Sequence, residues 1–223
     1  MSESQSSMDV EDLTSSLDRH IDLLEEGHRM HRKIKFLLDI RGLLIINKLQ
    51  GDYVEFGVYR GEMMYAAGKI LAPHIRKYIG LDTFTGLPEP IAGDQDRFVF
   101  ETPGFMSAPL ETAKRLMKDH ETVLIRGDFR DEEPKRRLAN EAGPISVLSL
   151  DCNWPSSVEA ALLGSCPLLQ SGSIVYFDDY FVGTREPNFN RLLLDRATEE
   201  YGLVFEEFMT YPPCGRAFLV EKQ

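Results

Sequence analysis

The stretch Gly51-Asp52-Tyr53-Val54-Glu55-Phe56-Gly57-Val58-Tyr59-Arg60-Gly61-Glu62 decides the fold. Its residues 53–58 form a mostly apolar run rich in β-forming residues, and residues 63–71 after it have a helical pattern. A glycine turn between a strand and a helix leaves bare backbone and free N–H groups, which suit a nucleotide-like ligand. The stretch therefore predicts strand, tight turn and helix beside a ligand, with a turn that serves packing alone as the alternative.

The spacing of this turn is Glu-x-Gly-x-x-x-Gly, which differs from the dinucleotide pattern Gly-x-Gly-x-x-Gly. Glu55 leads the turn, and a carboxylate at that point would repel a pyrophosphate. A ligand with a cationic group fits better, and S-adenosylmethionine carries both a sulfonium and an ammonium group. The spacing therefore favours a methyl donor over a nicotinamide cofactor.

Acidic residues also follow other strand-like runs. Asp82 comes some 25 residues after the first turn, where the second strand of a βαβ unit presents an acid to the ribose hydroxyls of an adenosine. Asp128 could accept a hydrogen bond from an adenine amino group, with Phe129 as an apolar contact, or it could cap the next element. Two further runs end in Asp151 and in the pair Asp178-Asp179. We expect these acids to meet at one edge of a sheet.

Strand-like and helical segments alternate along the whole chain. The expected strands, counted with the acids at their ends, are 53–58, 77–84, 123–129, 145–151 and 173–180, and the expected helices are 63–71, 110–119, 131–142, 155–169 and 190–201. Two final runs, 204–208 and 216–220, have the short connection of an antiparallel hairpin. The pattern predicts an α/β fold with a doubly wound, mostly parallel sheet, Rossmann-like in type, and a C-terminal antiparallel hairpin.

The chain divides into three expected parts. Residues 1–12 are rich in serine and acids and are expected to form a disordered tail, and 13–50 have the periodicity of an N-terminal helical extension with breaks at two glycines, Gly27 and Gly42. Residues 51–223 form the main domain. Its proline-rich loop, 86–109, is interpreted as a lid over the substrate or as an ordered surface loop.

Histidines in the N-terminal extension raise the question of a metal site. His28 and His31 lie one helical turn apart, but their neighbours are Arg29, Arg32 and Lys33. This part of the helix is therefore interpreted as a solvated basic face rather than as a pair of metal ligands. The apolar positions of the extension could serve a homodimer as well as the core.

Composition limits the function classes. The chain has 223 residues, 43% of them hydrophobic, which is enough for one α/β domain. The formal net charge of -11 argues against binding to nucleic acid or to an anionic membrane. The three cysteines are widely spaced and match no zinc pattern, which favours a reduced, cytoplasmic setting. Neither a signal core nor a membrane span is expected.

Four motifs together resemble the macrocin O-methyltransferase family, which is a family of class I S-adenosylmethionine-dependent enzymes that methylate sugar hydroxyls of natural products. The motifs are Glu55-Phe56-Gly57-Val58-Tyr59-Arg60-Gly61, Leu81-Asp82-Thr83-Phe84-Thr85-Gly86-Leu87-Pro88, Leu150-Asp151 and Phe177-Asp178-Asp179-Tyr180. The similarity covers about residues 41–220. The run from Asp82 to Pro88 and the distance from Asp151 to Asp178 are its most distinctive parts.

The resemblance implies the ligands of the site. Residues matching Glu55, Gly57 and Gly61 surround the methionine portion of the cofactor, and Asp82 takes the ribose. With their neighbours in the same turns, the expected cofactor-binding residues are Glu55, Gly57, Tyr59, Arg60, Gly61, Asp82, Thr83, Phe84, Gly127, Asp128 and Phe129. Arg60 could orient the cofactor's carboxylate or pair with Glu62.

The resemblance also implies that Asp151, Asp178 and Asp179 bind Mg²⁺. Carboxylate oxygens suit this hard cation, which lowers the pKa of a hydroxyl chelated to it. The alternative is that Asp151 caps a helix and the Asp178-Asp179 pair is only a polar turn. The family usually has a second acid and then Tyr-Glu after its metal-binding Asp, whereas this chain has Cys152-Asn153-Trp154-Pro155.

The chemistry of methyl transfer gives the three acids a catalytic role. An in-line displacement requires chiefly that the acceptor hydroxyl be aligned with the methyl group. Asp151, Asp178 and Asp179 are the expected catalytic residues, and Asp151 is the nearest candidate for the base that takes the hydroxyl proton. Trp154 and Tyr180 could line the acceptor pocket or serve packing. The acceptor is expected to be a small hydroxylated molecule.

Two other classes stay open at this point. A nicotinamide-dependent oxidoreductase would use the same type of sheet, and binding of NAD in place of S-adenosylmethionine would identify it. A methyltransferase-like binding or scaffold protein would bind the cofactor without turnover.

Overall fold

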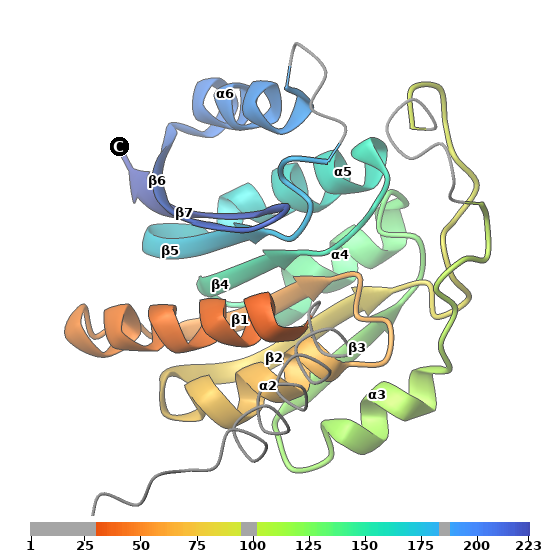
Figure 1. Cartoon of the computed structure of the whole chain (residues 1–223), viewed down its shortest axis with the longest axis horizontal. Helices are drawn as coiled ribbons and strands as arrows, with labels where there is room; N and C mark the ends of the chain where they lie inside the picture. Colours follow the sequence, from red (N-terminus) through yellow and green to blue (C-terminus); the bar gives the residue numbers. More distant parts are fainter. Residues whose placement is uncertain (1–29, 95–101, 183–187) are drawn as a thin grey trace, which may run out of the picture.

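The computed structural model describes residues 30–94, 102–182 and 188–223. Its centre is a seven-stranded sheet with the order β3-β2-β1-β4-β5-β7-β6 (Figure 1). After a helix over 30–46, the elements in chain order are β1 (Gly51–Phe56), α2 (Glu62–Leu71), η1 (Ala72–His74), β2 (Ile75–Asp82), α3 (Leu110–Leu116), β3 (Thr122–Arg126), α4 (Glu132–Glu141), β4 (Ile145–Leu150), α5 (Pro155–Ser165), η2 (Cys166–Leu168), β5 (Leu169–Phe177), α6 (Phe189–Tyr201), β6 (Leu203–Tyr211) and β7 (Gly215–Lys222). The predicted tail, Gly27 and His28 lie outside the described residues.

The strand pairing confirms the predicted fold class. β1 pairs in parallel with β2 on one side and with β4 on the other, and the parallel set is completed by β3 and β5. β7 is antiparallel to both β5 and β6. Chain order reverses between β1 and β4, and in such sheets the crevice at the carboxyl ends of the strands beside the reversal holds the ligand.

Two apolar layers cover the two faces of the sheet (Figure 1). Helix 30–46, α2 and α3 pack on one face, and α4, α5 and α6 pack on the other. Side chains of β1 alternate between the two layers. Tyr53 belongs to the first layer, while Val54 and Phe56 belong to the second.

Helix 30–46 runs through Gly42, so the predicted break at this residue is wrong. Phe36, Leu37, Ile40 and Leu44 lie on one side of the helix and are fully buried against the sheet. Burial of four large side chains outweighs the cost of about 1 kcal/mol for a glycine within a helix. The helix is therefore part of the layer that covers the sheet.

Several predicted helices end earlier in the structure. α5 stops at Ser165 instead of residue 169, and the short η2 with Pro167 follows it. Proline has no N–H for a helical hydrogen bond, which explains the change. α3 likewise ends at Leu116 instead of residue 119.

No helix in the described parts of the chain is long and apolar enough to cross a membrane. No disulfide bond joins Cys152, Cys166 and Cys214 in the described parts of the chain. The cytoplasmic setting and the domain boundaries stay predictions.

Candidate active site

A cavity of about 340 Å³ lies at the carboxyl ends of β1, β2 and β4. It brings together eight of the residues expected from the sequence. They are Glu55, Gly57, Tyr59, Arg60, Asp82, Thr83, Phe129 and Asp151. The other expected residues do not line this cavity: Gly61, Phe84, Gly127, Asp128, Asp178 and Asp179.

Glu55 is a buried carboxyl group in the wall of the cavity, with 1% of its surface exposed. The hydroxyl of Tyr53, two residues earlier on the same face of β1, donates a hydrogen bond to it. Burial raises the pKa of Glu55 to about 7, although the Tyr53 hydrogen bond and the charge of Lys33 oppose the shift. Glu55 can therefore change its charge near neutral pH.

Asp82 organises the backbone of two turns beside the cavity. Its carboxylate accepts hydrogen bonds from the N–H of Tyr59 at 2.8 Å and from the N–H of Phe84 at 2.7 Å. Both of these residues have left-handed backbones, with φ of 52° and 56°. Burial raises the pKa of Asp82 despite these hydrogen bonds. The carboxylate thus holds the turns after β1 and β2 together.

Gly57 allows the ends of β1 and β4 to approach each other. It has φ of 88°, and a Cβ atom at this position would lie 2.0 Å from the carbonyl oxygen of Asp151. Gly61, also with a positive φ, precedes α2, and a Cβ atom there would lie 3.1 Å from the Cα of Ala113. The two glycines of the motif are therefore required by close packing at both ends of the turn.

Arg60 and Asp128 have partners within the protein. Arg60 is more than half exposed, and its Nη1 lies 3.9 Å from Oε1 of Glu62. Asp128 forms an ion pair of 2.7 Å with Arg130 and accepts a hydrogen bond from the backbone N–H of the same residue. Gly127 donates its N–H to the carbonyl of Asp82 at 2.9 Å. Roles for Arg60, Gly127 and Asp128 in binding a cofactor stay predictions.

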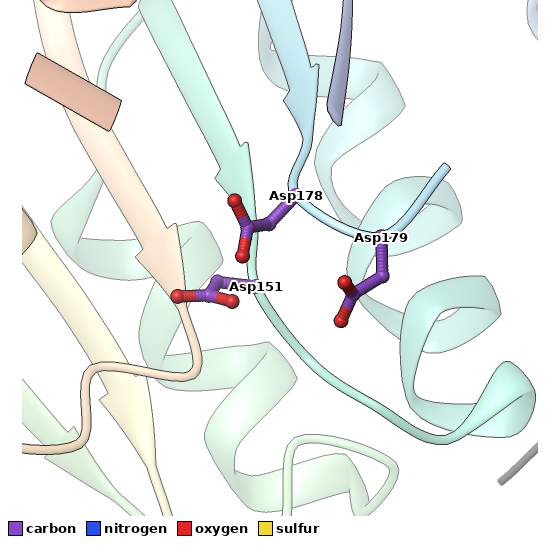
Figure 2. Close-up of side chains that lie close together, drawn as sticks. All are labelled: Asp151, Asp178 and Asp179. Atoms are coloured by element: carbon purple, nitrogen blue, oxygen red, sulfur yellow. The ribbon is translucent and has the colours of Figure 1, made fainter. Parts of the chain in front are cut away.

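Asp151, Asp178 and Asp179 form an acid cluster beside the cavity. Asp151 follows β4, and the other two follow β5, so that three side chains from the ends of neighbouring strands lie close together (Figure 2). One oxygen from each carboxylate lies within 4.8 Å of the others, which a single metal ion could span. The sequence predicted that these three acids lie at one edge of the sheet, and the structure places them there.

Two cations from helix 30–46 contact the acid cluster. Arg32 donates to Asp178 from Nε at 3.0 Å and from Nη2 at 2.7 Å. Lys33 donates a hydrogen bond to Asp151, and its Nζ lies 3.4 Å from Oδ2 of Asp178. Burial alone would raise the pKa of Asp178, but the charges of Lys33 and Arg32 outweigh it and hold that pKa well below its usual range.

These contacts correct the interpretation of a solvated basic face. The side chains of Arg32 and Lys33 are only 11% and 6% exposed, whereas His31 is exposed as expected. Lys33 shares its side of the helix with Phe36 and Ile40, so helical spacing was the only signal that could have placed it near the sheet.

Trp154 and Tyr180 are buried and have packing contacts within the protein, and a role for them at the acceptor stays a prediction. Trp154 is fully buried, and its Nε1 donates to the carbonyl of Pro88 at 3.1 Å. Tyr180 packs against the rings of Phe177 and Phe218. The stretch after Asp151 therefore includes an anchor for the loop that begins at Gly86.

The cavity has further walls besides the expected site residues, and part of them belongs to the loop 86–109 that was interpreted as a lid. Loop residues Gly86, Leu87, Pro88, Phe105 and Met106 line it, as do Met30, Lys33, Val58, Glu62, Met63, Cys152, Asn153 and Ser157. Most of these residues have no chemical signature in the sequence. Their common feature is a position next to a strand end or in the long loop.

The doubly wound sheet, the crevice at its reversal and the acid-led glycine turn fit the class of S-adenosylmethionine-dependent methyltransferases, and the family match shows this class. The sequence matches the macrocin-O-methyltransferase (TylF) family over residues 20–190. The chain belongs to this family, and it is an O-methyltransferase that depends on S-adenosylmethionine.

Solved structures of low sequence identity share the fold. The O-methyltransferase NovP has a TM-score of 0.68 at 20% identity, with 86% of this chain and 80% of that chain covered. CalS11, the calicheamicin methyltransferase, has a TM-score of 0.58 at 21% identity, with 96% and 87% covered. MycE, from the mycinamycin pathway, has a TM-score of 0.51 at 16% identity, with 84% of this chain and 48% of MycE covered. No curated protein matches the sequence.

Proposed function

We propose that this protein transfers the methyl group of S-adenosylmethionine to a hydroxyl group of a small, diol-bearing natural product, such as a sugar, with Mg²⁺ held by Asp151, Asp178 and Asp179. The observation that carries the proposal is the cavity that is lined both by Glu55 and Asp82 and by Asp151 of the acid cluster. Donor and acceptor would thus meet in one space. Family membership favours this function over an oxidoreductase or a scaffold.

The donor half of the proposal rests on the residues around Glu55. S-adenosylmethionine, when bound, supplies an electrophilic methyl group. The carboxylate of Glu55 would face the cationic methionine portion, and Asp82 has oxygen lone pairs left for ribose hydroxyls after its two backbone hydrogen bonds. Gly57 presents bare backbone, and Phe129 offers an apolar wall.

The acceptor half rests on the acid cluster. Three carboxylates within 4.8 Å are a suitable donor set for a hard cation, and Mg²⁺, when bound, lowers the pKa of a chelated hydroxyl and fixes its direction. MycE, which shares the fold, was solved with Mg and SAH. Asp151 lines the cavity, so its carboxylate is the proposed acceptor of the hydroxyl proton.

The loop 86–109 is proposed to cover the substrate. Leu87 and Met106 lie in the cavity wall, and the backbone of Leu87 bonds to Gly104 and Phe105. Exclusion of water would protect the reacting groups. Residues 95–101 lie outside the described part of the chain. The proposed homodimer and the absence of nucleic-acid binding stay predictions.

A direct test begins with binding. Calorimetric titration should detect S-adenosylmethionine and not NAD, and transfer of a labelled methyl group should then be measured on a panel of sugars and other diols. We expect chelation of divalent ions to reduce transfer on the order of tenfold or more. Asp179→Asn should reduce transfer while donor binding persists, and Asp195→Asn, at an exposed position on α6, is the control.

The outcomes separate the alternatives. Donor binding without transfer to any diol would support the binding protein and contradict the proposal. Transfer that is insensitive to chelation would leave methyl transfer standing and remove the metal from it.

A further inference from the structure

The acid cluster is already neutralised in part by the protein itself. Lys33 lies between two of the three carboxylates, with its hydrogen bond to Asp151 and its contact of 3.4 Å to Asp178. A cation shared by the cluster would bind the same oxygens. Two positive charges repel each other strongly at such short distance in a buried site, so the ammonium and an ion would not occupy it together.

The two cationic side chains are held differently. Arg32 binds Asp178 with two parallel hydrogen bonds, a bidentate geometry that its rigid guanidinium favours. Lys33 is a point charge on a flexible stem, and unlike Arg32 it lines the cavity, which offers space for the side chain to move into. Lys33 is therefore the cation that can leave.

The helix that carries Lys33 has its own anchors. The Phe36 ring stacks on that of Tyr176 at 4.3 Å, and Tyr211 donates a hydrogen bond to Asp39 at 3.1 Å. Neither anchor involves Lys33. Movement of this one side chain would leave the helix in position.

We propose that Lys33 is a displaceable counter-ion of the acid cluster: Lys33 and a divalent cation occupy the Asp151–Asp178 pair in turn, so the ammonium lowers the affinity for the ion. This inference rests on the metal site of the proposed function. A divalent ion beside Arg32 would balance three carboxylates, which one ammonium beside Arg32 does not. The ion would thus exchange with Lys33 while Arg32 keeps Asp178 in place.

Mn²⁺ binding tests the exchange without any turnover. Free Mn²⁺ is measured by electron paramagnetic resonance during titration of the full chain, of Lys33→Gln and of Lys35→Gln. Lys35 is the matched control, because it lies on the same helix, is 56% exposed and pairs with Asp39 instead of the cluster. We expect Lys33→Gln to bind Mn²⁺ on the order of tenfold more tightly and Lys35→Gln to match the original protein.

Chemical labelling provides the second measurement. An amine-acetylating reagent should modify Lys33 slowly in the metal-free protein, because its side chain is 6% exposed. Added Mn²⁺ should increase labelling of Lys33 several-fold while labelling of Lys35 stays constant, as read by mass spectrometry of peptides.

Three results would overturn the proposal: equal Mn²⁺ affinity in Lys33→Gln, binding of Mn²⁺ while Lys33 stays protected, or no binding in any of the proteins. S-adenosylmethionine binding is titrated in the same preparations. If it persists, the chain is folded and the methyl-donor half of the proposed function stands even though the exchange fails.

Discussion

Glu55 is a carboxyl group whose charge depends on its surroundings. Burial raises its pKa to about 7, and Tyr53, Lys33, Asp82 and Asp178 are the charged or polar groups that modulate the shift. The folded protein therefore holds Glu55 protonated below about pH 7 and ionised above it. A cationic ligand prefers the ionised form, so its binding would be linked to loss of this proton.

We expect the affinity for S-adenosylmethionine to rise as the pH increases through about 7, by roughly tenfold at most between about pH 6 and pH 8. Calorimetric titration across this range measures it. Glu55→Gln should bind more weakly and show a flat profile. Glu62→Gln is the control, because Glu62 lines the same cavity but is exposed, and it should keep the pH dependence. A flat profile for the original protein would contradict the proposed contact.

The turns after β1 and β2 hold the ends of the strands together. The turn after β1 requires Gly57, because its backbone is left-handed and it abuts the Asp151 carbonyl. The turn after β2 requires the Asp82 carboxylate, which holds the N–H groups of Tyr59 and Phe84. Both turns thus depend on contacts between segments at the same sheet edge.

Gly57→Ala should abolish binding of S-adenosylmethionine and reduce the free energy of unfolding by about 2 kcal/mol or more. The new Cβ would lie 2.0 Å from a backbone atom, so β1 and β4 must separate at the site. Gly202→Ala is the matched control, since Gly202 also has a positive φ but no atom within 4 Å of a built Cβ. It should cost about 1 kcal/mol and leave binding intact. Chemical denaturation and ligand titration check both variants, and equal binding by both would refute the argument.

The loop that begins at Gly86 is anchored to α5. Asp94 is 1% exposed, and its carboxylate accepts hydrogen bonds from the N–H of Ser156 at 2.9 Å and from its hydroxyl at 2.7 Å. Arg130 lies 3.5 Å from the same carboxylate and donates to the carbonyl of Glu89. The anchor makes the first part of the loop a fixed wall of the cavity.

Asp94→Ala should lower the free energy of unfolding by about 3 kcal/mol, because the N–H and the hydroxyl of Ser156 lose their shared acceptor and Arg130 loses one of its two carboxylate partners. Ser156→Ala removes one hydroxyl and keeps the Asp94 carboxylate, so about 1 kcal/mol is expected. Denaturant unfolding compares the two variants. Similar losses in both would show that the carboxylate is not the centre of the anchor.

The whole molecule is a sheet between two helical layers, and the active site lies where one of these layers reaches the strand ends (Figure 1). Helix 30–46 belongs to that layer. Its apolar side packs on the sheet, with Phe36 against Tyr176 of β5 and Tyr211 of β6, and its residues Arg32 and Lys33 contact the acids. The core and the site therefore depend on the same packing.

Phe36→Ala should reduce the free energy of unfolding by about 3–4 kcal/mol, since it empties a fully buried site between Tyr176 and Tyr211. Ile46→Ala, on the same helix but 77% exposed, should change it by about 0.5 kcal/mol or less. Chemical denaturation measures both variants. Equal losses would mean that the helix does not contribute its apolar side to the core.

Local patterns allowed much of the fold to be predicted. Alternating strand and helix signals predicted the sheet class and its C-terminal hairpin, and the parallel strands then required Glu55, Asp82, Asp151 and Asp178 to end at one edge. The role of Asp128 could not be predicted in the same way. Its pairing with Arg130, two residues away, is local, but nothing in the composition distinguished an ion pair from a ligand contact.

The sequence by itself determined the order of the elements, the glycine turn and the acids at the strand ends, because each depends on the conformational preferences of neighbouring residues. Only the tertiary structure decided what faces those acids. Lys33 meets Asp151 across 118 residues and Arg32 meets Asp178 across 146, and both contacts follow from the way helix 30–46 packs on the sheet. Helical spacing with Phe36 and Ile40 places Lys33 on the buried side of the helix, but only the packing of distant segments brings its ammonium group to Asp151.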